Sequence, residues 1–482
     1  MKLEEIKQHL QSATKVDDQK VTGIAFDSRN VKPGFVFFAI SGSSSNGNDF
    51  INDAIQNGAI LIVTEQEQTQ ATAVPTMVVR SVKKALALIS HRFFHEPSKK
   101  LNLVGVTGTN GKTSVTHMIH YIYEALGTNS GLIGTNSYKV PGAKATTNTT
   151  PMSSILNEML NSSYENQMKD VIMEVSSHGI KENRVDHIDF STFIFTNLSE
   201  DHLDYHKNMD DYMWTKMRPF IALSADKKAI VNLDDPCGPY YCDVTIAQTW
   251  TYGLQSTADL SARNIEQSLS GSTFDLYYKG FFACQVKTPY FGIYNVYNAL
   301  AVLAYFASEG YHPQRIALLF QSLPTIEGRF DTFKTRSGIY VVVDYAHTPD
   351  AVENVLKSLS AVAEGNVITV LGAGGDRDKS KRAPMGKAAL ANSKHVILTS
   401  DNPRSEDPHN IIYDMLMGNV RQNYTLCIDR EIAIEKALKM AKPNDVVILL
   451  GKGHEKTQTI KEKKIRFCDK TIARYHIQKH EL

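Results

Sequence analysis

A short glycine-rich segment, GTNGKT at residues 108–113, lies between an apolar strand-like segment and an apolar helical one. Its glycines allow backbone N–H groups to close on phosphate oxygens, while the helix N-terminus and Lys112 supply positive charge. Thr113 offers the hydroxyl that commonly binds Mg²⁺ in such loops. A glycine that the longer form of this motif requires is replaced by Val106. The residues expected to contact a nucleotide are Gly108, Thr109, Asn110, Gly111, Lys112, Thr113 and Ser114; the alternative is a tight turn without ligand.

Two further polar clusters follow later strand-like segments. Glu174 lies near the end of the segment 171–175, and the sequence TNLSEDHLDYH at 196–206 contains His202. A carboxylate at a strand end beside a phosphate loop is suited to hold Mg²⁺ directly or through water. Taken alone, Glu174 could be a helix cap and His202 a surface histidine. Three such clusters in one sheet favour a site for a metal and a nucleotide.

The elements that must position these residues alternate between short β-branched strands and helices, which indicates an α/β fold with parallel sheets. Ligands bind at the carboxyl ends of such strands. At 482 residues, about three domains are expected. The predicted domains are a small α/β domain at 1–98, a phosphate-loop ATPase-like sheet domain at 99–331 and a Rossmann-like domain at 332–482. The predicted strands are 101–107, 171–175, 192–196, 339–344, 367–371, 395–399 and 445–450.

Composition excludes several classes of function. The formal charge of +1 provides no general positive field for nucleic acid or an anionic membrane. No apolar run approaches the roughly 20 residues of a membrane span, and the N-terminus lacks an apolar signal core. The five cysteines form no CxxC pair, so reduced thiols are expected rather than a metal clip at Cys237 and Cys242. These features predict a cytoplasmic protein without membrane insertion.

Six motifs in one order carry a family resemblance. GTNGKT, EVSSH and TNLSEDHLDYH are followed by GIYNVYN at 292–298, DYAHTP at 344–349 and GKGHE at 451–455. The chain resembles the Mur ligases, of the MurE type, over its whole length. The resemblance implies that Thr113, Glu174 and His202 hold magnesium. It also implies that Lys216 is carbamylated (N6-carboxylysine) and orients a second magnesium ion, although by residue type alone it is an unremarkable helix lysine.

The same resemblance implies two groups of substrate contacts. The nucleotide would also meet Asn295, Asn298, Arg329, Asp344 and His347. A uridine-linked muramoyl peptide would meet Ser28, Asn148, Thr149, Thr150, Ser176, Glu182 and Arg184. Glu182 departs from the family, whose members often carry glutamine there, and an acidic side chain near an anionic substrate is unfavourable unless paired.

An amino-acid pocket is expected after two C-terminal strands. Arginine is the side chain best suited to grip a carboxylate, so Arg404 in the segment DNPR favours diaminopimelate, whose far end carries a carboxylate, over lysine. Alternatively, Arg404 pairs with Glu406 or Asp407. In the family that the chain resembles, DNPR accompanies meso-diaminopimelate, and the resemblance implies a pocket of Arg382, Asp401, Asn402, Pro403, Arg404, Gly451 and Glu455.

The resemblance implies ATP-dependent amide-bond formation that adds meso-diaminopimelate to UDP-N-acetylmuramoyl-L-alanyl-D-glutamate through an acyl phosphate, in peptidoglycan precursor synthesis. Lys112, Glu174, His202 and Lys216 would be the catalytic set, with ATP as substrate, Mg²⁺ as cofactor, small molecules as partners and a monomeric state. Ligation of lysine, a folylpolyglutamate-synthetase-like ligase, and a nucleotide-binding regulatory protein without chemistry remain alternatives.

Overall fold

The computed structural model describes residues 1–42, 45–67, 73–135, 138–143, 148–255 and 257–482. The chain forms two compact units. The first contains Met1–Thr107, Thr128–Phe193 and Ala222–Lys227, and the second contains Gly108–Gly127, Ile194–Ile221 and Lys228–Leu482. Each unit is described by itself, and the domain boundaries expected from the sequence stay predictions. No helix within the described ranges is long and apolar enough to span a bilayer.

The first unit begins with a small parallel sheet. Its strand order is β1-β2-β3-β4, and an apolar cluster covers each face. Leu86 and Ile89 of one helix contribute to the first cluster, and Ile51 of another contributes to the second. The elements are α1 (Leu3–His9), β1 (Gly23–Ala25), β2 (Phe35–Phe38), α2 (Ile51–Gln56), β3 (Ala59–Thr64), β4 (Thr76–Val78) and α3 (Val82–Phe93).

The first unit also contains the parallel strands β5, β6 and β8, after which candidate functional residues lie. β5 (Asn102–Thr107) and β6 (Ser130–Ile133) flank β8 (Asp170–Glu174), and β7 (Tyr138–Lys139) pairs antiparallel with β6. All five residues of β8 are buried, which suits a strand that is covered on both faces. The remaining elements are α5 (Ser153–Glu165), α6 (Ser177–Lys181) and β9 (Thr192–Phe195), whose last two residues belong to the second unit.

The second unit starts with the helix after the glycine-rich loop. Strands β10, β11 and β12 are parallel, and β12, β13 and β14 form an antiparallel meander. The meander was not expected from the sequence. The elements are α4 (Lys112–Ala125), α7 (Met209–Ala222), β10 (Lys228–Asn232), α8 (Gly238–Val244), β11 (Gln248–Gly253), β12 (Leu260–Ser268), β13 (Gly271–Tyr278), β14 (Phe281–Thr288), α9 (Ile293–Ser308) and α10 (Pro313–Phe320).

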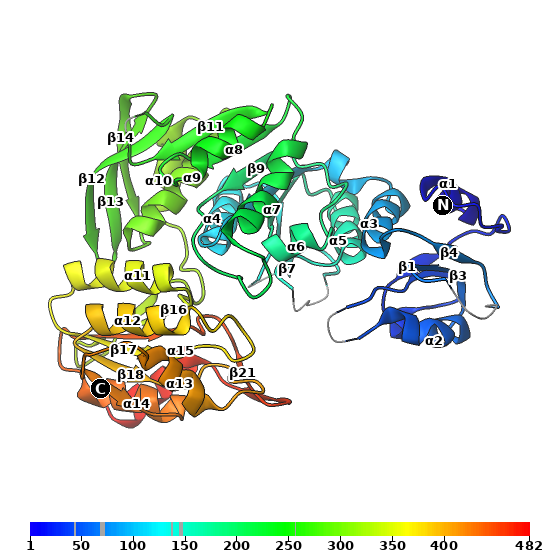
Figure 1. Ribbon diagram of the computed structural model, residues 1–482. Coiled ribbons are helices and arrows are strands. Elements are labelled where there is room, and N and C mark those ends of the chain that lie inside the picture. The colour runs from blue at the N-terminus through cyan, green and yellow to red at the C-terminus, as the bar shows by residue number, and fades with distance from the viewer. Residues whose placement is uncertain (43–44, 68–72, 136–137, 144–147, 256) are drawn as a thin grey trace. The chain divides into compact units, whose positions relative to one another are not determined.

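The C-terminal part of this unit is a six-stranded sheet of order β15-β16-β20-β17-β18-β19, parallel except for β15. Figure 1 shows these elements in yellow to red. The four strands expected there are confirmed. The elements are β15 (Asp331–Lys334), β16 (Tyr340–Asp344), α11 (Pro349–Val362), β17 (Val367–Leu371), α12 (Arg382–Asn392), β18 (His395–Leu398), α13 (Pro408–Leu416), β19 (Tyr424–Leu426), α14 (Arg430–Met440), β20 (Val446–Leu450), β21 (Thr457–Ile460), β22 (Lys463–Arg466) and α15 (Asp469–Lys479).

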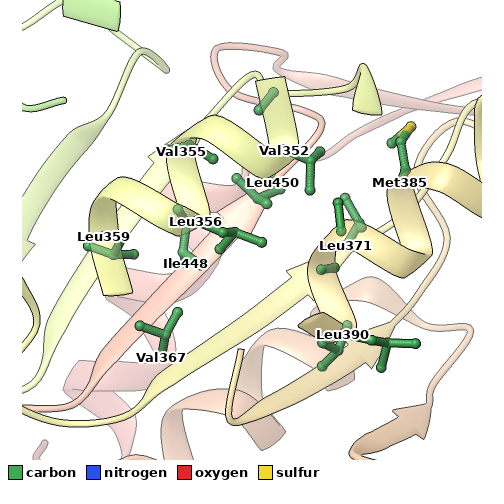
Figure 2. Close-up of a cluster of buried hydrophobic side chains, with 14 of the residues drawn as sticks. Val352, Val355, Leu356, Leu359, Val367, Leu371, Met385, Leu390, Ile448 and Leu450 are labelled. Carbon is green, nitrogen blue, oxygen red and sulfur yellow. The ribbon is translucent and has the colours of Figure 1, made fainter. Parts of the chain in front are cut away.

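Helices cover both faces of the six-stranded sheet. Val352 and Leu356 of α11 and Met385 of α12 pack with Leu371 and Ile448 of the sheet (Figure 2). Helices α14 and α15 contribute to a second cluster, formed by the strand side chains that point the other way. This three-layer arrangement leaves the carboxyl ends of β16, β17, β18 and β20 free to carry functional loops.

Candidate active site

The glycine-rich loop has a backbone that only glycine adopts easily. Gly108 and Gly111 have φ angles of +150° and +88°. A Cβ atom on Gly108 would overlap the Thr196 hydroxyl, and one on Gly111 would lie 2.5 Å from Oδ1 of Asn298. The Asn110 N–H donates to Oδ1 of Asn197 at 2.9 Å. The loop is therefore held in shape by the segment after β9 and by α9, before any ligand binds.

Two lysines converge on this loop. Nζ of Lys112 donates to the carbonyls of Gly108 and Thr109, each at 2.8 Å. Nζ of Lys216, from α7, also donates to the Gly108 carbonyl at 2.8 Å and lies 4.5 Å from the centre of the Tyr212 ring. Lys216 is 1% exposed, and its pKa is lowered well below the ordinary value by burial, with a further contribution from the charge of Lys112. The neutral amine of Lys216 is thereby favoured.

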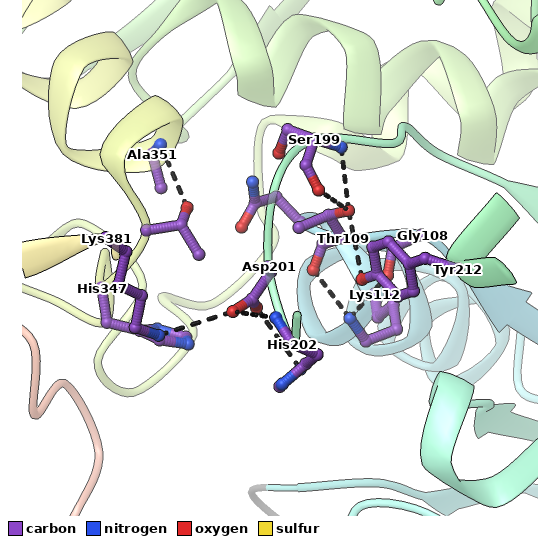
Figure 3. A network of polar contacts seen from close by, with 12 residues as sticks. Gly108, Thr109, Lys112, Ser199, Asp201, His202, Tyr212, His347, Ala351 and Lys381 are labelled. Atoms are coloured by element: carbon purple, nitrogen blue, oxygen red, sulfur yellow. Dashed lines mark hydrogen bonds and ion pairs between the residues drawn. The ribbon is translucent and has the colours of Figure 1, made fainter. Parts of the chain in front are cut away.

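A buried carboxylate, Asp201, joins the loop region to the C-terminal sheet domain (Figure 3). Lys381 lies 3.4 Å from its Oδ1, and Nε2 of His202 lies 3.3 Å from its Oδ2. Burial opposes ionisation, but His202, Lys381 and His347 together hold the pKa of Asp201 below its ordinary value. Burial, and then the charge of Lys381, lowers the pKa of His347 to about 4. Asp201 is therefore an anion in a pocket of nitrogen donors.

Thr113 and the C-terminal nucleotide candidates lie together. Nη2 of Arg329 donates to the Thr113 hydroxyl at 3.0 Å, and the guanidinium lies 4.6 Å from the centre of the Tyr345 ring. Asp344 accepts hydrogen bonds from the N–H groups of Phe330 and Ala346, both at 2.7 Å. Burial raises the pKa of Asp344, and Arg329 opposes this rise. Asp344 thus fixes the backbone beside Arg329.

The two asparagines on α9 are buried and bonded to each other. Nδ2 of Asn298 donates to Oδ1 of Asn295 at 2.9 Å, and Nδ2 of Asn295 donates to the Phe291 carbonyl at 2.8 Å. Since Asn298 also borders Gly111, the pair lies at the edge of the phosphate loop.

Glu174 lies in the first unit, at the end of β8. Its carboxylate accepts hydrogen bonds from the N–H of Thr135 at 2.8 Å and from the Thr135 hydroxyl at 3.1 Å. The helix that follows, α6, is capped by Ser176, whose Oγ accepts from the Gly179 N–H at 3.1 Å. Glu174 is thus not the cap of this helix.

The expected muramoyl-peptide residues gather around Thr150. Its hydroxyl donates to the Glu174 carbonyl at 3.0 Å and accepts from the Ser176 N–H at 2.9 Å, and its carbonyl accepts from Arg184 at 3.0 Å. Thr149 accepts a bond from the Thr135 hydroxyl at 3.0 Å. Asn148 and Thr149 follow residues that lie outside the described ranges.

Two residues of the expected peptide site stand apart in their contacts. Glu182 forms an ion pair with Lys83, which supplies the positive partner that an acidic side chain needs there. Ser28 is buried at the start of a 3₁₀ turn, and its carbonyl accepts from Asn57 at 2.9 Å.

The two arginines of the expected amino-acid pocket differ. Arg382 is buried and its guanidinium is engaged by Glu406 and Asp414 at 2.8–2.9 Å. Arg404 is partly buried, has a φ of +51° and donates through Nη1 to the Gly375 carbonyl at 2.5 Å. Burial, and then repulsion from Arg377, lowers the pKa of Arg404. Among the described residues no carboxylate forms an ion pair with Arg404, so neither Glu406 nor Asp407 is its partner.

A buried polar network lies beside Arg404. Nδ2 of Asn402 donates to Asp401 at 2.9 Å and to Glu455 at 2.8 Å, and Nζ of Lys452 lies 2.8 Å from the same Glu455 oxygen. Gly451 has a φ of +104°, and a Cβ there would lie 2.7 Å from Asp401. Pro403 directly follows Asn402 in the chain and is also buried. Burial raises the pKa of Asp401, while Lys452 opposes this rise.

Sequence reasoning missed three charged residues that hold these sites together. Asp201 was quoted within its motif but assigned no role, although a carboxylate directly before a candidate metal histidine was a usable signal. Lys381 contacts Asp201 across 180 positions of sequence, which no local pattern reveals. Lys452 lies in the GKGHE motif and is fully buried beside Glu455, yet lysine in a glycine-rich turn is ordinarily a surface residue.

The fold and the site define an α/β protein with a preformed glycine-rich loop between a strand and a helix, and with a separate cluster of polar side chains around Arg404 on a second sheet. Family models match along the chain: the Mur ligase family catalytic domain at residues 20–94, the Mur ligase middle domain at 106–306, and the Mur ligase glutamate ligase domain at 328–453. The chain belongs to the Mur ligase family, as the motifs indicated.

Relatives and solved structures agree with this assignment. Proteins named UDP-N-acetylmuramoyl-L-alanyl-D-glutamate--2,6-diaminopimelate ligase are 40% identical in Halalkalibacterium halodurans and 41% identical in Bacillus velezensis; each match covers 95% of this chain and 94% of the relative. A solved structure of a ligase with the same name is 30% identical, with a TM-score of 0.70 and 99% of both chains covered. A Mycobacterium tuberculosis folylpolyglutamate synthase, at 16% identity and a TM-score of 0.63 over 77% of this chain and 92% of that chain, shares the fold alone.

Proposed function

We propose that this protein adds meso-diaminopimelate to UDP-N-acetylmuramoyl-L-alanyl-D-glutamate at the expense of ATP, in peptidoglycan precursor synthesis. The observation that carries the proposal is a preformed phosphate loop with two converging lysines, in a chain about 40% identical to ligases of that name over nearly its whole length. Because the reaction consumes ATP and a nucleotide-linked sugar, we place it in the cytoplasm. The monomeric state stays a prediction.

The residues present fit ATP with magnesium. Lys112 already directs its ammonium onto loop carbonyls, and phosphate oxygens could take their place as acceptors. The Thr113 hydroxyl faces the cationic guanidinium of Arg329, so its lone pairs already meet positive charge. Glu174, which is buried within the first unit, carries a carboxylate of the kind that Mg²⁺ prefers, and we propose Thr113, Glu174 and His202 as the magnesium ligands. Bound magnesium would supply positive charge that reduces repulsion between the phosphates and an attacking carboxylate.

Lys216 is suited to carbamylation. A neutral amine can attack CO₂, forming an N–C bond and releasing one proton, whereas an ammonium cannot. Burial of Lys216 favours the neutral amine, and the product would place an anion beside Lys112. The carbamate would give the lysine a negative group able to orient a cation.

The reaction would proceed in two steps at the substrate itself. An oxygen of the D-glutamyl carboxylate attacks the γ-phosphorus of ATP, and the bond to the ADP oxygen breaks, which gives an acyl phosphate. The free amine of diaminopimelate then attacks the acyl carbon, the C–O bond to phosphate breaks, and the nitrogen loses a proton. Lys112 and Arg329 stabilise charge on the transferred phosphoryl group. No protein nucleophile is required.

Arg404 favours diaminopimelate over lysine. Its guanidinium has no carboxylate partner among the described residues, so a substrate carboxylate could supply one. The ammonium at the same end of diaminopimelate would meet Glu455 and Asp401. Lysine would bring an ammonium group without a carboxylate, and this ammonium would be repelled by the guanidinium of Arg404.

Phosphate release tests the proposal. Purified protein with ATP, magnesium and the UDP-muramoyl dipeptide should release phosphate only when diaminopimelate is added, with the tripeptide product seen by mass spectrometry. Lys112→Ala should abolish release, while the exposed Lys357→Ala on α11 should leave it unchanged. ATP binding with no release that depends on acceptor and amine would instead indicate a nucleotide-binding protein without this chemistry, and preference for lysine would indicate the lysine-adding alternative.

A further inference from the structure

Helices α14 and α15 carry a cluster of histidines and glutamates that the ligase reaction does not use. Both helices cover the same face of the six-stranded sheet. Glu431 and Glu435 lie four residues apart on α14, and His476 of α15 lies four residues before His480, the residue that caps the C-terminus of α15, so each pair shares one side of its helix. The cluster is built from both helices.

Three of these residues have the composition and spacing of a metal site. One ligand atom from each of Glu435, His476 and His480 lies within 4.8 Å of the others. Nε2 of His480 lies 2.7 Å, and Nδ1 of His476 lies 3.7 Å, from the same Glu435 oxygen. Donors at zinc–ligand bond lengths in a tetrahedron lie roughly 3.3 Å apart, a value between the two separations from the Glu435 oxygen, so rotations of these side chains would be needed to place the three atoms around one ion.

His476, the more buried of the two histidines, has one ring nitrogen directed towards a carboxylate and the other towards the cluster. His476 is 3% exposed, and its Nε2 lies 3.3 Å from the carboxylate of Glu431. Its other nitrogen, Nδ1, is buried, makes no hydrogen bond and is directed towards Glu435. Histidines that bind metals ordinarily donate their second ring N–H to a carboxylate, which fixes the ring and the tautomer. Glu431 would do this for His476 and leave Nδ1 free to ligate.

A cationic side chain already lies at the cluster. Nζ of Lys439 lies 2.9 Å from the same Glu435 oxygen that the histidines approach. The Lys439 side chain is half-exposed, so it can move aside into solvent when a doubly charged ion arrives. An ion bound here would replace a mobile charge by one held through both helices.

We propose that Glu435, His476 and His480 form a zinc-binding site that joins α14 to α15, with Glu431 as the positioning residue and a water molecule as the fourth ligand. Two imidazoles and one carboxylate suit zinc, and cobalt or nickel as its substitutes, better than magnesium. Zinc held in this way would fasten α15 to the domain that carries the amino-acid pocket. The site is independent of the proposed ligase chemistry.

Zinc titration of the full chain tests the site. Protein freed of metal with a chelator, then kept in excess magnesium and a reductant, is titrated with zinc against a chromogenic zinc chelator. His480→Gln and Glu435→Gln, both at partly exposed positions, should each lower the bound zinc by one equivalent. Glu431→Gln should keep the site but weaken it about 10- to 100-fold. The exposed histidine variant His409→Gln on α13 is the matched control and should bind as the parent does.

A second readout separates binding from folding. Zinc should raise the melting temperature of the parent and of His409→Gln, but not that of His480→Gln, whose circular dichroism without metal should match the parent. Equal zinc stoichiometry and affinity in the parent, His480→Gln and Glu435→Gln would overturn the proposal. So would a parent that binds no zinc at micromolar concentration, because the cluster would then be a set of hydrogen bonds and ion pairs only.

Discussion

Replacing Arg404 by alanine should convert a selective amino-acid pocket into a weak and unselective one. In the structure the guanidinium makes a hydrogen bond to the Gly375 carbonyl, and burial together with Arg377 disfavours its charge. A substrate carboxylate would offset both burial and the repulsion from Arg377, since it brings a negative charge close to the guanidinium. The alanine variant removes the positive charge and leaves that carboxylate in a partly buried position without a partner.

The magnitude follows from the kind of contact. A hydrogen bond to a charged group contributes about 1.5–3 kcal/mol, and removing one partner of a buried charged pair costs about 2–5 kcal/mol. Because Arg404 is only partly buried, we expect its loss to cost about 2–4 kcal/mol of transition-state stabilisation. At 1.36 kcal/mol for each factor of ten, kcat/KM for diaminopimelate should fall roughly 30- to 1,000-fold.

The assay is phosphate release at fixed ATP and UDP-muramoyl dipeptide, with diaminopimelate and lysine each varied. Arg404→Ala should lose most of its kcat/KM with diaminopimelate and lose little with lysine, so the ratio between the two amino acids should collapse. Arg421→Ala, at an exposed arginine before β19, is the matched control and should keep the ratio of the parent. An unchanged ratio in Arg404→Ala would refute the reasoning and remove Arg404 from the pocket.

Two further substitutions test buried charges. Lys216→Met should abolish ligation. Because the depressed pKa of Lys216 makes the unfolded chain bind more protons than the folded chain, the unfolding free energy of the parent should increase as pH rises towards 10.5. Urea unfolding at several pH values should show a smaller increase in the variant, and an equally large increase would contradict burial of the amine. Arg430→Met leaves the fully buried Asp469 without its ion-pair partner and should cost about 3–5 kcal/mol of unfolding free energy, most of it recovered in Arg430→Met/Asp469→Leu. A loss under about 1 kcal/mol in the single variant would contradict this expectation.

The fold could be predicted where strands and their loops obey strong local rules. β5, the glycine-rich loop and α4 follow from an apolar run, two glycines that need left-handed backbone and a lysine at the helix start. The C-terminal strands are continuous apolar runs buried on both faces, which is a clear signal. The meander β12–β14 was missed because its strands are rich in polar side chains and form no continuous apolar run.

The candidate sites were predictable only where one segment carried the chemistry. The contacts of Lys112 with its own loop follow from a motif of six residues. The environment of Lys216 does not, because its burial depends on Gly108 and Tyr212, which other segments supply. Arg382 and Arg404 look equivalent in the sequence. In the structure, however, Glu406 and Asp414 pair with Arg382, whereas the guanidinium of Arg404 bonds to a backbone carbonyl and could bind a substrate carboxylate.

The measurement that bears most directly on the ligase mechanism is the fate of oxygen in the substrate carboxylate. UDP-muramoyl dipeptide labelled with ¹⁸O in the D-glutamyl carboxylate is incubated with the protein, ATP, magnesium and diaminopimelate, and the released phosphate is analysed by mass spectrometry. Formation of an acyl phosphate predicts that each phosphate carries one ¹⁸O atom, with an equal amount of tripeptide formed. Unlabelled phosphate accompanying tripeptide formation would contradict transfer of the phosphoryl group to the carboxylate.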